Sequence, residues 1–237
     1  MKGARALLVR VGADGTEVGG RWNAPVDHAS GDFAYVPITE PEPILRRHAA
    51  PLGRWAPAVE RLGTALPERL RAVQAHADPD FRHLTYGDRG ERGRQIRSKL
   101  GPGDALVFYA GLRDVRERRL VYALIGLLTV EAIVAAREVP PGRRGENAHT
   151  RRRRVGETDI VVFGRPATSG RFDRCLSFAT YRSGAYRVEP GLLEAWGGLG
   201  VRDGYVQRSA RLPELLDPAR FGTWLDAQSV ALVRRDN

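Results

Sequence analysis

The sequence is poor in lysine, in cysteine and in long apolar runs. Of its 38 lysine and arginine residues only Lys2 and Lys99 are lysines, so arginine carries almost all of the positive charge. Cys175 is the only cysteine, which excludes an intrachain disulfide and leaves a thiolate-based zinc site dependent on other ligands. The longest uncharged apolar run, residues 120–130, is well short of the ~20 residues that span a bilayer, and the apolar run near the N-terminus is too short for a signal peptide. We therefore expect a soluble, cytoplasmic protein that does not enter a membrane.

The motifs of several well-known chemistries are also missing. The chain has no GxGxxG or GxxxxGK[ST] loop for a dinucleotide or a nucleotide phosphate, and no GxSxG nucleophile elbow. Its five histidines form no HExxH motif and no i, i+4 pair, and the Cys/His set of a zinc deaminase is absent. The sequence therefore predicts no metal site and identifies no cofactor.

What the sequence has in excess is positive charge. The 237 residues carry a formal net charge of +10, the sequence pI is near 10.5, and 42% of the residues are hydrophobic. Such a surplus on a globular composition favours polyanionic partners, because basic side chains attract phosphates and release their counterions. We therefore expect DNA or a nucleotide as the partner. The alternative is a basic surface that only reflects the arginine-rich usage of a GC-rich genome.

The apolar pattern predicts short strands and a few helices. Strands are expected at residues 4–11, 33–38, 105–111, 120–134, 159–164, 172–178, 185–188 and 201–207. Helices are expected from residue 67 to about 78, at 92–100, within 189–198 and at 217–228. Because strands and helices do not alternate regularly, we expect an α+β fold with a curved mixed sheet or a small β-barrel and peripheral helices. A single domain over residues 1–237, with a helical insertion near 40–100, is the simplest organisation.

The segment GPGDALVFYAGLR, residues 101–113, is the most specific local pattern. Phe108 and Tyr109 point to opposite faces of the predicted strand, so one ring can enter the core while the other faces a cavity. An aromatic ring at the mouth of a barrel can stack on a base. The alternative is that both rings belong to the core and that Asp104 is only a turn residue.

The loop GGRWNAPVD, residues 19–27, brings a stacking face and polar groups together. Trp22 offers the face, Asn23 offers donors and acceptors for a base edge, and Asp27 is a possible acceptor for an exocyclic amine. An Asx-turn loop with Trp22 as a lid over the core is the other interpretation.

Arginines recur beside turns and helix starts, where a phosphate would be bound. In LTYGDRGERGRQIR, residues 84–97, Tyr86 and Asp88 precede a predicted helix that carries Arg94. A solvated charged helix is the alternative there, and a plain hairpin connection is the alternative for FGRPATSGRFDR, residues 163–174. The candidate phosphate-binding residues are Arg94, Arg113, Arg151, Arg165 and Arg171.

The segment ENAHTRRRR, residues 146–154, combines a polar pair with an arginine run. If the segment is extended, Asn147 and His149 point to the same side, whereas successive arginines alternate and cannot all contact one line of phosphates. His149 is the natural acid/base candidate because its unperturbed pKa lies close to neutral pH. We predict a site at Asn147 and His149 with arginines as its basic rim, and we place Asp27 and Asp88 beside His149 as candidate catalytic residues.

Two family resemblances follow from these segments. The GD-apolar-apolar-Phe-Tyr strand resembles the entry strand of PUA-like domains such as ASCH and EVE domains, which implies a small barrel that holds RNA or a modified or flipped base. Residues 7–38, 83–96, 103–113, 146–152 and 196–209 together resemble the nucleotide modification associated domain 3 family. This second resemblance implies a role in systems that make or recognise modified DNA bases, and it supplies no established catalytic residues.

Three functions are compatible with these patterns. The first is a binding module in which Trp22, Tyr86, Phe108 and Tyr109, with Asn23 and Asn147, hold a base while arginines contact the backbone. The second is an enzyme that modifies a nucleobase or a nucleotide. The third is a partner-binding subunit whose arginines only cover the surface.

Overall fold

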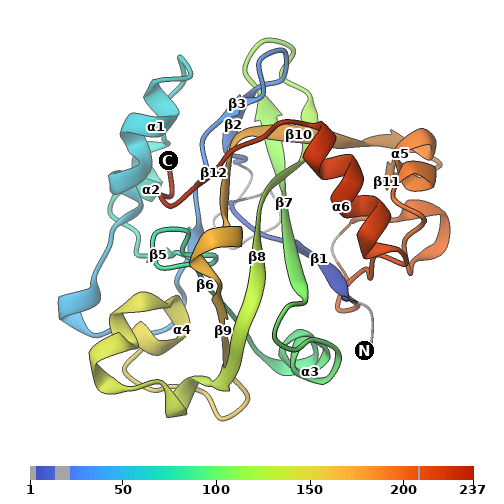
Figure 1. Ribbon diagram of the computed structural model, residues 1–237. Coiled ribbons are helices and arrows are strands. Elements are labelled where there is room, and N and C mark those ends of the chain that lie inside the picture. Colours follow the sequence, from blue (N-terminus) through green and yellow to red (C-terminus); the bar gives the residue numbers. More distant parts are fainter. Residues whose placement is uncertain (1–3, 14–21, 208) are drawn as a thin grey trace.

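The computed structural model of the chain describes residues 4–13, 22–207 and 209–237. The glycine-rich loop that contains Trp22 falls partly on residues 14–21, which lie outside the described residues. A large mixed sheet runs through the molecule, and helices are arranged around it (Figure 1).

Strand β7 (Ala105–Asp114) lies in the middle of this sheet. It pairs antiparallel with β8 (Leu120–Ala135) on one side, and parallel with β1 (Ala6–Arg10) and β2 (Pro25–Asp27) on the other. The sheet is completed by β3 (Asp32–Phe33), β6 (Thr85–Asp88), β9 (Ile160–Gly164), β10 (Gly170–Arg182), β11 (Ala185–Val188) and β12 (Leu232–Val233). Strands β4 (Ile38–Thr39) and β5 (Ala75–His76) form a separate antiparallel pair.

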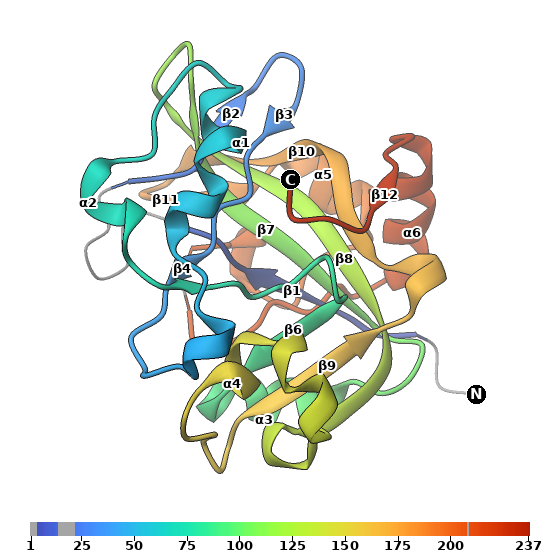
Figure 2. The same cartoon turned by 90° about the vertical axis from the view of Figure 1, so that its left-hand side faces the viewer.

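Strand β8 serves two parts of the sheet. Its first half pairs with β10, and its second half pairs with β9, which in turn pairs with β6. The register with β7 shifts between Phe108, which pairs with Gly126, and Tyr109, which pairs with Leu124. The β6–β9 pair therefore lies at the end of the sheet next to α3 and α4 (Figures 1 and 2).

The predicted α+β class with a curved mixed sheet is confirmed. The sheet is not closed into a barrel, because its strand order runs from β11 to β3 as two ends. The barrel alternative, and with it the PUA-like resemblance, is not confirmed.

Helices cover both faces of the sheet. They are α1 (Ala56–Glu60), α2 (Glu68–Arg71), α3 (Gly90–Lys99), α4 (Ala148–Arg151), α5 (Pro190–Ala195) and α6 (Pro218–Ala227). In Figure 1, α1 and α2 lie to one side of the sheet, and α5 and α6 lie to the other. The side chain of Asp217 caps α6 by accepting a hydrogen bond from the Arg220 backbone, as the sequence predicts. No helix in the described part of the chain is long and apolar enough to cross a membrane.

Alternate residues of β7 enter different cores. Leu106 and Phe108 join the apolar cluster on the α1 side, whereas Val107 and Tyr109 join the cluster that contains Trp196 on the α5–α6 side. Because both faces of the strand are covered, its two-residue periodicity places both aromatic rings in apolar surroundings.

Three predicted elements differ from the structure. The helix expected over residues 67–78 ends at Arg71, because the following chain extends to pair β5 with β4. The strand expected over residues 33–38 is broken into β3 and β4. The strand expected over residues 201–207 is interrupted by a turn in which Asp203 and Gly204 have φ of 50° and 63°, values that a strand does not allow.

Candidate functional site

A cavity of about 280 Å³ opens where β1, β4, β5, β6, α3 and α4 meet. We call it the site cavity. Its lining includes Arg10, Thr39, His76, Asp78, Tyr86, Gly87, Asp88, Arg89, Arg92, His149 and Arg152. The elements that supply these residues are far apart in the sequence, and the sheet brings them together.

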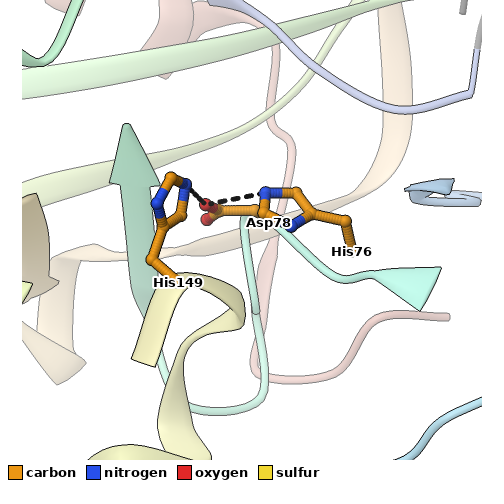
Figure 3. Close-up of side chains that lie close together, drawn as sticks. All are labelled: His76, Asp78 and His149. Carbon is orange, nitrogen blue, oxygen red and sulfur yellow. Dashed lines mark ion pairs between the residues drawn. The ribbon is translucent and has the colours of Figure 1, made fainter. Parts of the chain in front are cut away.

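The floor of the site cavity consists of His76, Asp78 and His149 (Figure 3). The carboxylate of Asp78 lies between the two imidazole rings, with Oδ2 3.7 Å from Nε2 of His76 and 3.5 Å from Nε2 of His149. All three residues are buried, and their nearest ligand atoms lie within 4.8 Å of one another. Two imidazoles and one carboxylate at this spacing are a donor set that a metal ion can share.

Each of these histidines also contacts a second buried carboxylate through its other ring nitrogen. Nδ1 of His76 lies 2.5 Å from Oε2 of Glu40, and Nδ1 of His149 lies 3.0 Å from Oδ2 of Asp159. The guanidinium of Arg152 lies between these two carboxylates, 3.2 Å from Glu40 and 3.3 Å from Asp159. The network fixes the orientation of both rings.

The pKa values of the acids in this network shift in opposite directions. Burial raises the pKa of Asp78 well above its usual value, and the hydrogen bonds from the Gly87 backbone and from Asn147 oppose this rise only in part. Burial also acts to raise the pKa of Glu40, but the hydrogen bond and the charge of His76 outweigh it and bring the pKa below its usual value. Asp159 behaves like Glu40, with His149 as its partner.

Asn147 and Gly87 position the floor residues. Asn147 caps α4, because its Oδ1 accepts a hydrogen bond from the His149 backbone at 2.9 Å, and its Nδ2 donates to Asp78 Oδ1 at 3.3 Å. The backbone N–H of Gly87 donates to the Asp78 carboxylate at 2.8 Å. A Cβ atom at Gly87 would lie 2.4 Å from the His149 ring and 2.9 Å from Asp78, so the close approach requires glycine.

The wall of the site cavity carries a second polar group. The hydroxyl of Tyr86 donates to Asp88 at 2.6 Å, and Arg92 contacts both residues, at 2.9 Å from the Tyr86 hydroxyl and 3.1 Å from the Asp88 carboxylate. Arg89 lies next to them and pairs with Glu42 at 3.2 Å. The cavity therefore combines a buried histidine–carboxylate floor with an arginine-containing wall.

Four of the predicted site residues gather at this cavity. Tyr86, Asp88 and His149 line it, and Asn147 lies directly behind it. The segment that contains Asn147 and His149 is a capped helical turn and not extended, so Asn147 reaches His149 through the backbone of α4.

Sequence reasoning missed His76, Asp78, Glu40 and Asp159. The His-x-Asp spacing at 76 and 78 was the available signal, because alternate residues of an extended segment share one side. Arg152 belongs to the arginine run that the sequence predicts as a basic rim, and the structure buries it inside the network.

Other predicted residues lie elsewhere. Trp22, Asn23 and Arg113 line a second cavity of about 240 Å³, where the buried Asn23 amide donates to the Gly111 carbonyl at 2.7 Å. Asp27 forms an ion pair with Arg116 at 2.7 Å and does not line the site cavity.

Phe108 and Tyr109 belong to the core. Their exposed fractions are 0% and 2%, and the hydroxyl of Tyr109 donates to the Val206 carbonyl at 2.7 Å. Neither ring presents a free face on which a base can stack, because the sheet is covered on both sides. Asp104 accepts hydrogen bonds from the backbones of Arg5 and Gly101, as a turn residue does.

The five arginines predicted to bind phosphate do not line the site cavity. Arg94 pairs with Glu91 on the surface of α3, and Arg151 pairs with Asp80 at 2.5 Å. Arg171 is buried, with its guanidinium 4.9 Å from the centre of the Phe33 ring. Arg113 lines the second cavity, and Arg165 is exposed on the turn before β10. The cavity arginines are Arg10, Arg89, Arg92 and Arg152 instead.

The comparison with protein families agrees with the second sequence resemblance. The model of the family described as nucleotide modification associated domain 3 matches residues 5–196, which is most of the chain. The chain belongs to this family. The matched region of this nucleotide modification associated domain contains every residue that lines the site cavity. No curated protein and no solved structure matches the chain.

Proposed function

We propose that this nucleotide modification associated domain is an enzyme that modifies a nucleotide, or a base in DNA, held in the site cavity. The observation that carries the proposal is the buried cluster of His76, Asp78 and His149 at the floor of a cavity with arginines in its wall. Ionisable groups whose environment is strongly perturbed, and which lie in a cleft, are typical of catalytic sites. The description of the family, which associates it with nucleotide modification, supports a nucleotide or a nucleobase as the substrate.

The arginines of the cavity suit the phosphate of a nucleotide. Three arginines line the same cavity: Arg10 from β1, Arg89 from the N-cap of α3, and Arg92 from within α3. Guanidinium groups bind phosphate oxygens through paired, charge-assisted hydrogen bonds. A volume of about 280 Å³ lies just below the usual range of ligand pockets, so the cavity fits a base or a single nucleotide better than a dinucleotide.

The polar groups beside the arginines suit the edge of a base. The carboxylate of Asp88 is an acceptor, and the hydroxyls of Tyr86 and Thr39 both donate and accept. A base whose phosphate contacts the arginines would place its ring over the histidine floor, where the chemistry would take place.

A catalytic role explains the buried ionisable groups of the floor better than ligand binding alone does. The floor and the network behind it together bury six ionisable side chains: His76, Asp78, His149, Glu40, Asp159 and Arg152. Removing charged groups from water costs free energy that hydrogen bonds and ion pairs repay only in part. A site that only holds a base needs no such cluster. Base recognition without chemistry is the second candidate function, and the observation in its favour is the second cavity, whose lining includes both Trp22 and Arg113.

Arg89, the N-cap residue of α3, and Arg94, within α3, provide a matched test of the substrate site. Arg89 and Arg94 both have exposed side chains, and each pairs with a glutamate, but only Arg89 lines the site cavity. Binding of deoxynucleoside monophosphates and of a short DNA oligonucleotide is measured by calorimetry for the wild type, Arg89→Ala and Arg94→Ala. We expect Arg89→Ala to weaken binding about 10-fold, because a charged hydrogen bond is lost, and Arg94→Ala to leave it unchanged.

The outcomes separate the candidate functions. Equal weakening by both variants would mean that only surface charge attracts the ligand and would contradict the proposal. Retention of no nucleotide and no DNA at low salt would favour a partner-binding subunit. Products are sought by mass spectrometry with wild type and Asp78→Asn, and turnover that survives Asp78→Asn would exclude the floor as the reactive centre.

A further inference from the structure

We infer that His76, Asp78 and His149 bind one divalent transition-metal ion through Nε2, Oδ2 and Nε2. The three side chains come from β5, from the segment after it and from α4, and all three face the site cavity (Figure 3). This inference concerns the floor alone and does not depend on the identity of the substrate.

The spacing of the three ligand atoms fits an ion between them. Metal bonds of about 2.1 Å place neighbouring ligand atoms roughly 3.0 to 3.4 Å apart in octahedral or tetrahedral geometry. The observed separations from Asp78 Oδ2 are 3.7 Å and 3.5 Å. A movement of a few tenths of an ångström closes the difference for these two separations, and all three ligand atoms already lie within 4.8 Å of one another. These separations are also too long for direct hydrogen bonds between the rings and Asp78.

The surroundings of the histidines are those of metal ligands. The short contacts are made by Nδ1, at 2.5 Å to Glu40 and 3.0 Å to Asp159. Arg152 also approaches both Nδ1 atoms, at 3.3 Å for His149 and 3.4 Å for His76, but the carboxylate contacts are shorter. Because an ionised carboxylate can only accept, we assign the ring proton to Nδ1, which leaves the lone pair of Nε2 directed at the space beside Asp78. A carboxylate behind each ligating histidine fixes the tautomer and increases the basicity of the ligand.

The charge of the buried network also calls for a divalent cation. When Asp78 loses the proton that burial favours, as a metal ligand must, Glu40, Asp78 and Asp159 contribute three negative charges and Arg152 contributes one positive charge. The network with neutral histidines then has a net charge of −2. All of these groups are buried. One divalent ion next to Asp78 neutralises the network, which would otherwise hold uncompensated charge in a medium of low dielectric constant.

The donor set indicates the class of metal. Two imidazoles and one carboxylate suit zinc and iron(II), whereas calcium and magnesium prefer sites made of oxygen ligands. Three protein ligands on one side leave coordination positions open toward the site cavity. Two-histidine, one-carboxylate sites with open positions occur in mononuclear non-haem iron proteins and in zinc enzymes, and the experiment has an arm for each metal.

The test is metal binding by the full chain. Protein treated with a chelator is titrated with Co²⁺, Zn²⁺ and, without oxygen, Fe²⁺, and binding is followed by calorimetry and by the visible absorption of Co²⁺. We expect one equivalent to bind and to raise the Tm of the wild type. His76→Ala and His149→Ala should lose more affinity than Glu40→Gln, for which the loss of an outer carboxylate predicts a roughly 10- to 100-fold decrease.

A second histidine–carboxylate pair supplies the control. His83 lies 3.0 Å from Asp80, outside the floor, so His83→Ala should bind metal like the wild type. The inference is overturned if the wild type binds no equivalent of any of the three ions, or if His149→Ala binds as tightly as His83→Ala. If the alanine variants do not fold, the metal affinity of Glu40→Gln and the metal-dependent Tm of the wild type test the inference instead. Nucleotide binding by Arg89→Ala is measured separately, so failure of the metal site and failure of the substrate site can be told apart.

Discussion

At the scale of single residues, Gly87 allows the Asp78 carboxylate and the His149 ring to lie close together in the floor. Its N–H donates to Asp78, and its missing side chain leaves room for the His149 ring. The neighbouring residues on both sides, Tyr86 and Asp88, form the polar group of the cavity wall. One position of β6 therefore determines how closely α4 approaches the segment after β5.

Gly87→Ala tests this packing. The added methyl group would lie 2.4 Å from the His149 ring and 2.7 Å from the Asn147 side chain, so both must move. We expect the free energy of unfolding to fall by about 1–3 kcal/mol, as for other overpacked sites, together with weaker metal and nucleotide binding. Chemical denaturation and calorimetry measure the two effects.

Gly101→Ala is the matched control. No atom lies within 4 Å of a Cβ at Gly101, and its backbone does not require glycine. Denaturation curves of this variant should superimpose on those of the wild type. Equal stability and equal ligand binding of the two alanine variants would mean that the floor does not depend on the close approach at Gly87.

The site residues could be predicted from the sequence only where a local motif marked them. Asn147 and His149 lie in one short segment, and Tyr86 and Asp88 lie in another, so a local pattern predicts each pair as part of a site. Glu40 and Asp159 become neighbours of His76 and His149 only through folding. Contacts that join residues more than a hundred positions apart, such as Glu40 to Arg152, leave no local trace in the sequence.

At the scale of elements, continuous apolar runs predicted strands well. Segments that mix polar and apolar residues did not predict their secondary structure well. Strand β8 agrees with its predicted range to within one residue, and β7 begins where it was predicted and runs three residues longer. Most of β7 and the first half of β8 are buried on both faces, which gives the continuous apolar runs. Residues 140–157, over which the sequence predicts neither a strand nor a helix, contain α4, a helix of one turn whose cap is Asn147. Such a short helix depends on tertiary contacts, which periodicity does not report.

The segment after β12 contains an acid whose ionisation should control stability. Asp236 accepts a hydrogen bond from the Phe81 backbone at 3.1 Å. Burial, and then the charge of Asp80, raises the pKa of Asp236 to about 6 from an ordinary 3.8. The folded state therefore binds this proton more tightly than the unfolded state, so the contribution of Asp236 to stability falls as pH rises from about 4 through 6.

Asp236→Asn should remove this dependence. The amide keeps an oxygen for the Phe81 N–H and carries no charge. We expect the variant to be more stable than the wild type at pH 8, by at most about 3 kcal/mol, and to show no gain at pH 4. Glu157→Gln, which removes one exposed acid, is the control in the same urea titrations. A gain for Asp236→Asn that is equal at both pH values would show that the ionisation of Asp236 is not responsible.

At the scale of the whole molecule, the sheet separates the cavity from the C-terminal helices. The site cavity lies at the end where β6, α3 and α4 meet, and α5 and α6 pack on the other side of the sheet (Figures 1 and 2). The family match ends at residue 196, before α6 and β12, and it includes every cavity residue. The part of the chain that belongs to the nucleotide modification family is thus the part that builds the site.

The charge of the whole chain does not by itself locate the ligand. Of the arginines predicted to contact phosphate, Arg94 and Arg151 are paired with acids, and Arg171 is buried. A net charge of +10 favours polyanions over the whole surface, whereas recognition of a base needs a cavity. Two cavities are candidate binding sites for the base, and an experiment must distinguish them. They are the site cavity and the second cavity, whose lining includes Trp22 and Arg113.

The most direct measurement is a crystal structure of the full chain soaked with a deoxynucleoside monophosphate. We predict electron density for the nucleotide in the site cavity, with its phosphate within hydrogen-bond distance of Arg89 or Arg92 and its base above Asp78. Density only in the cavity beside Trp22 and Arg113, or an empty site cavity at saturating nucleotide, would contradict the proposed function.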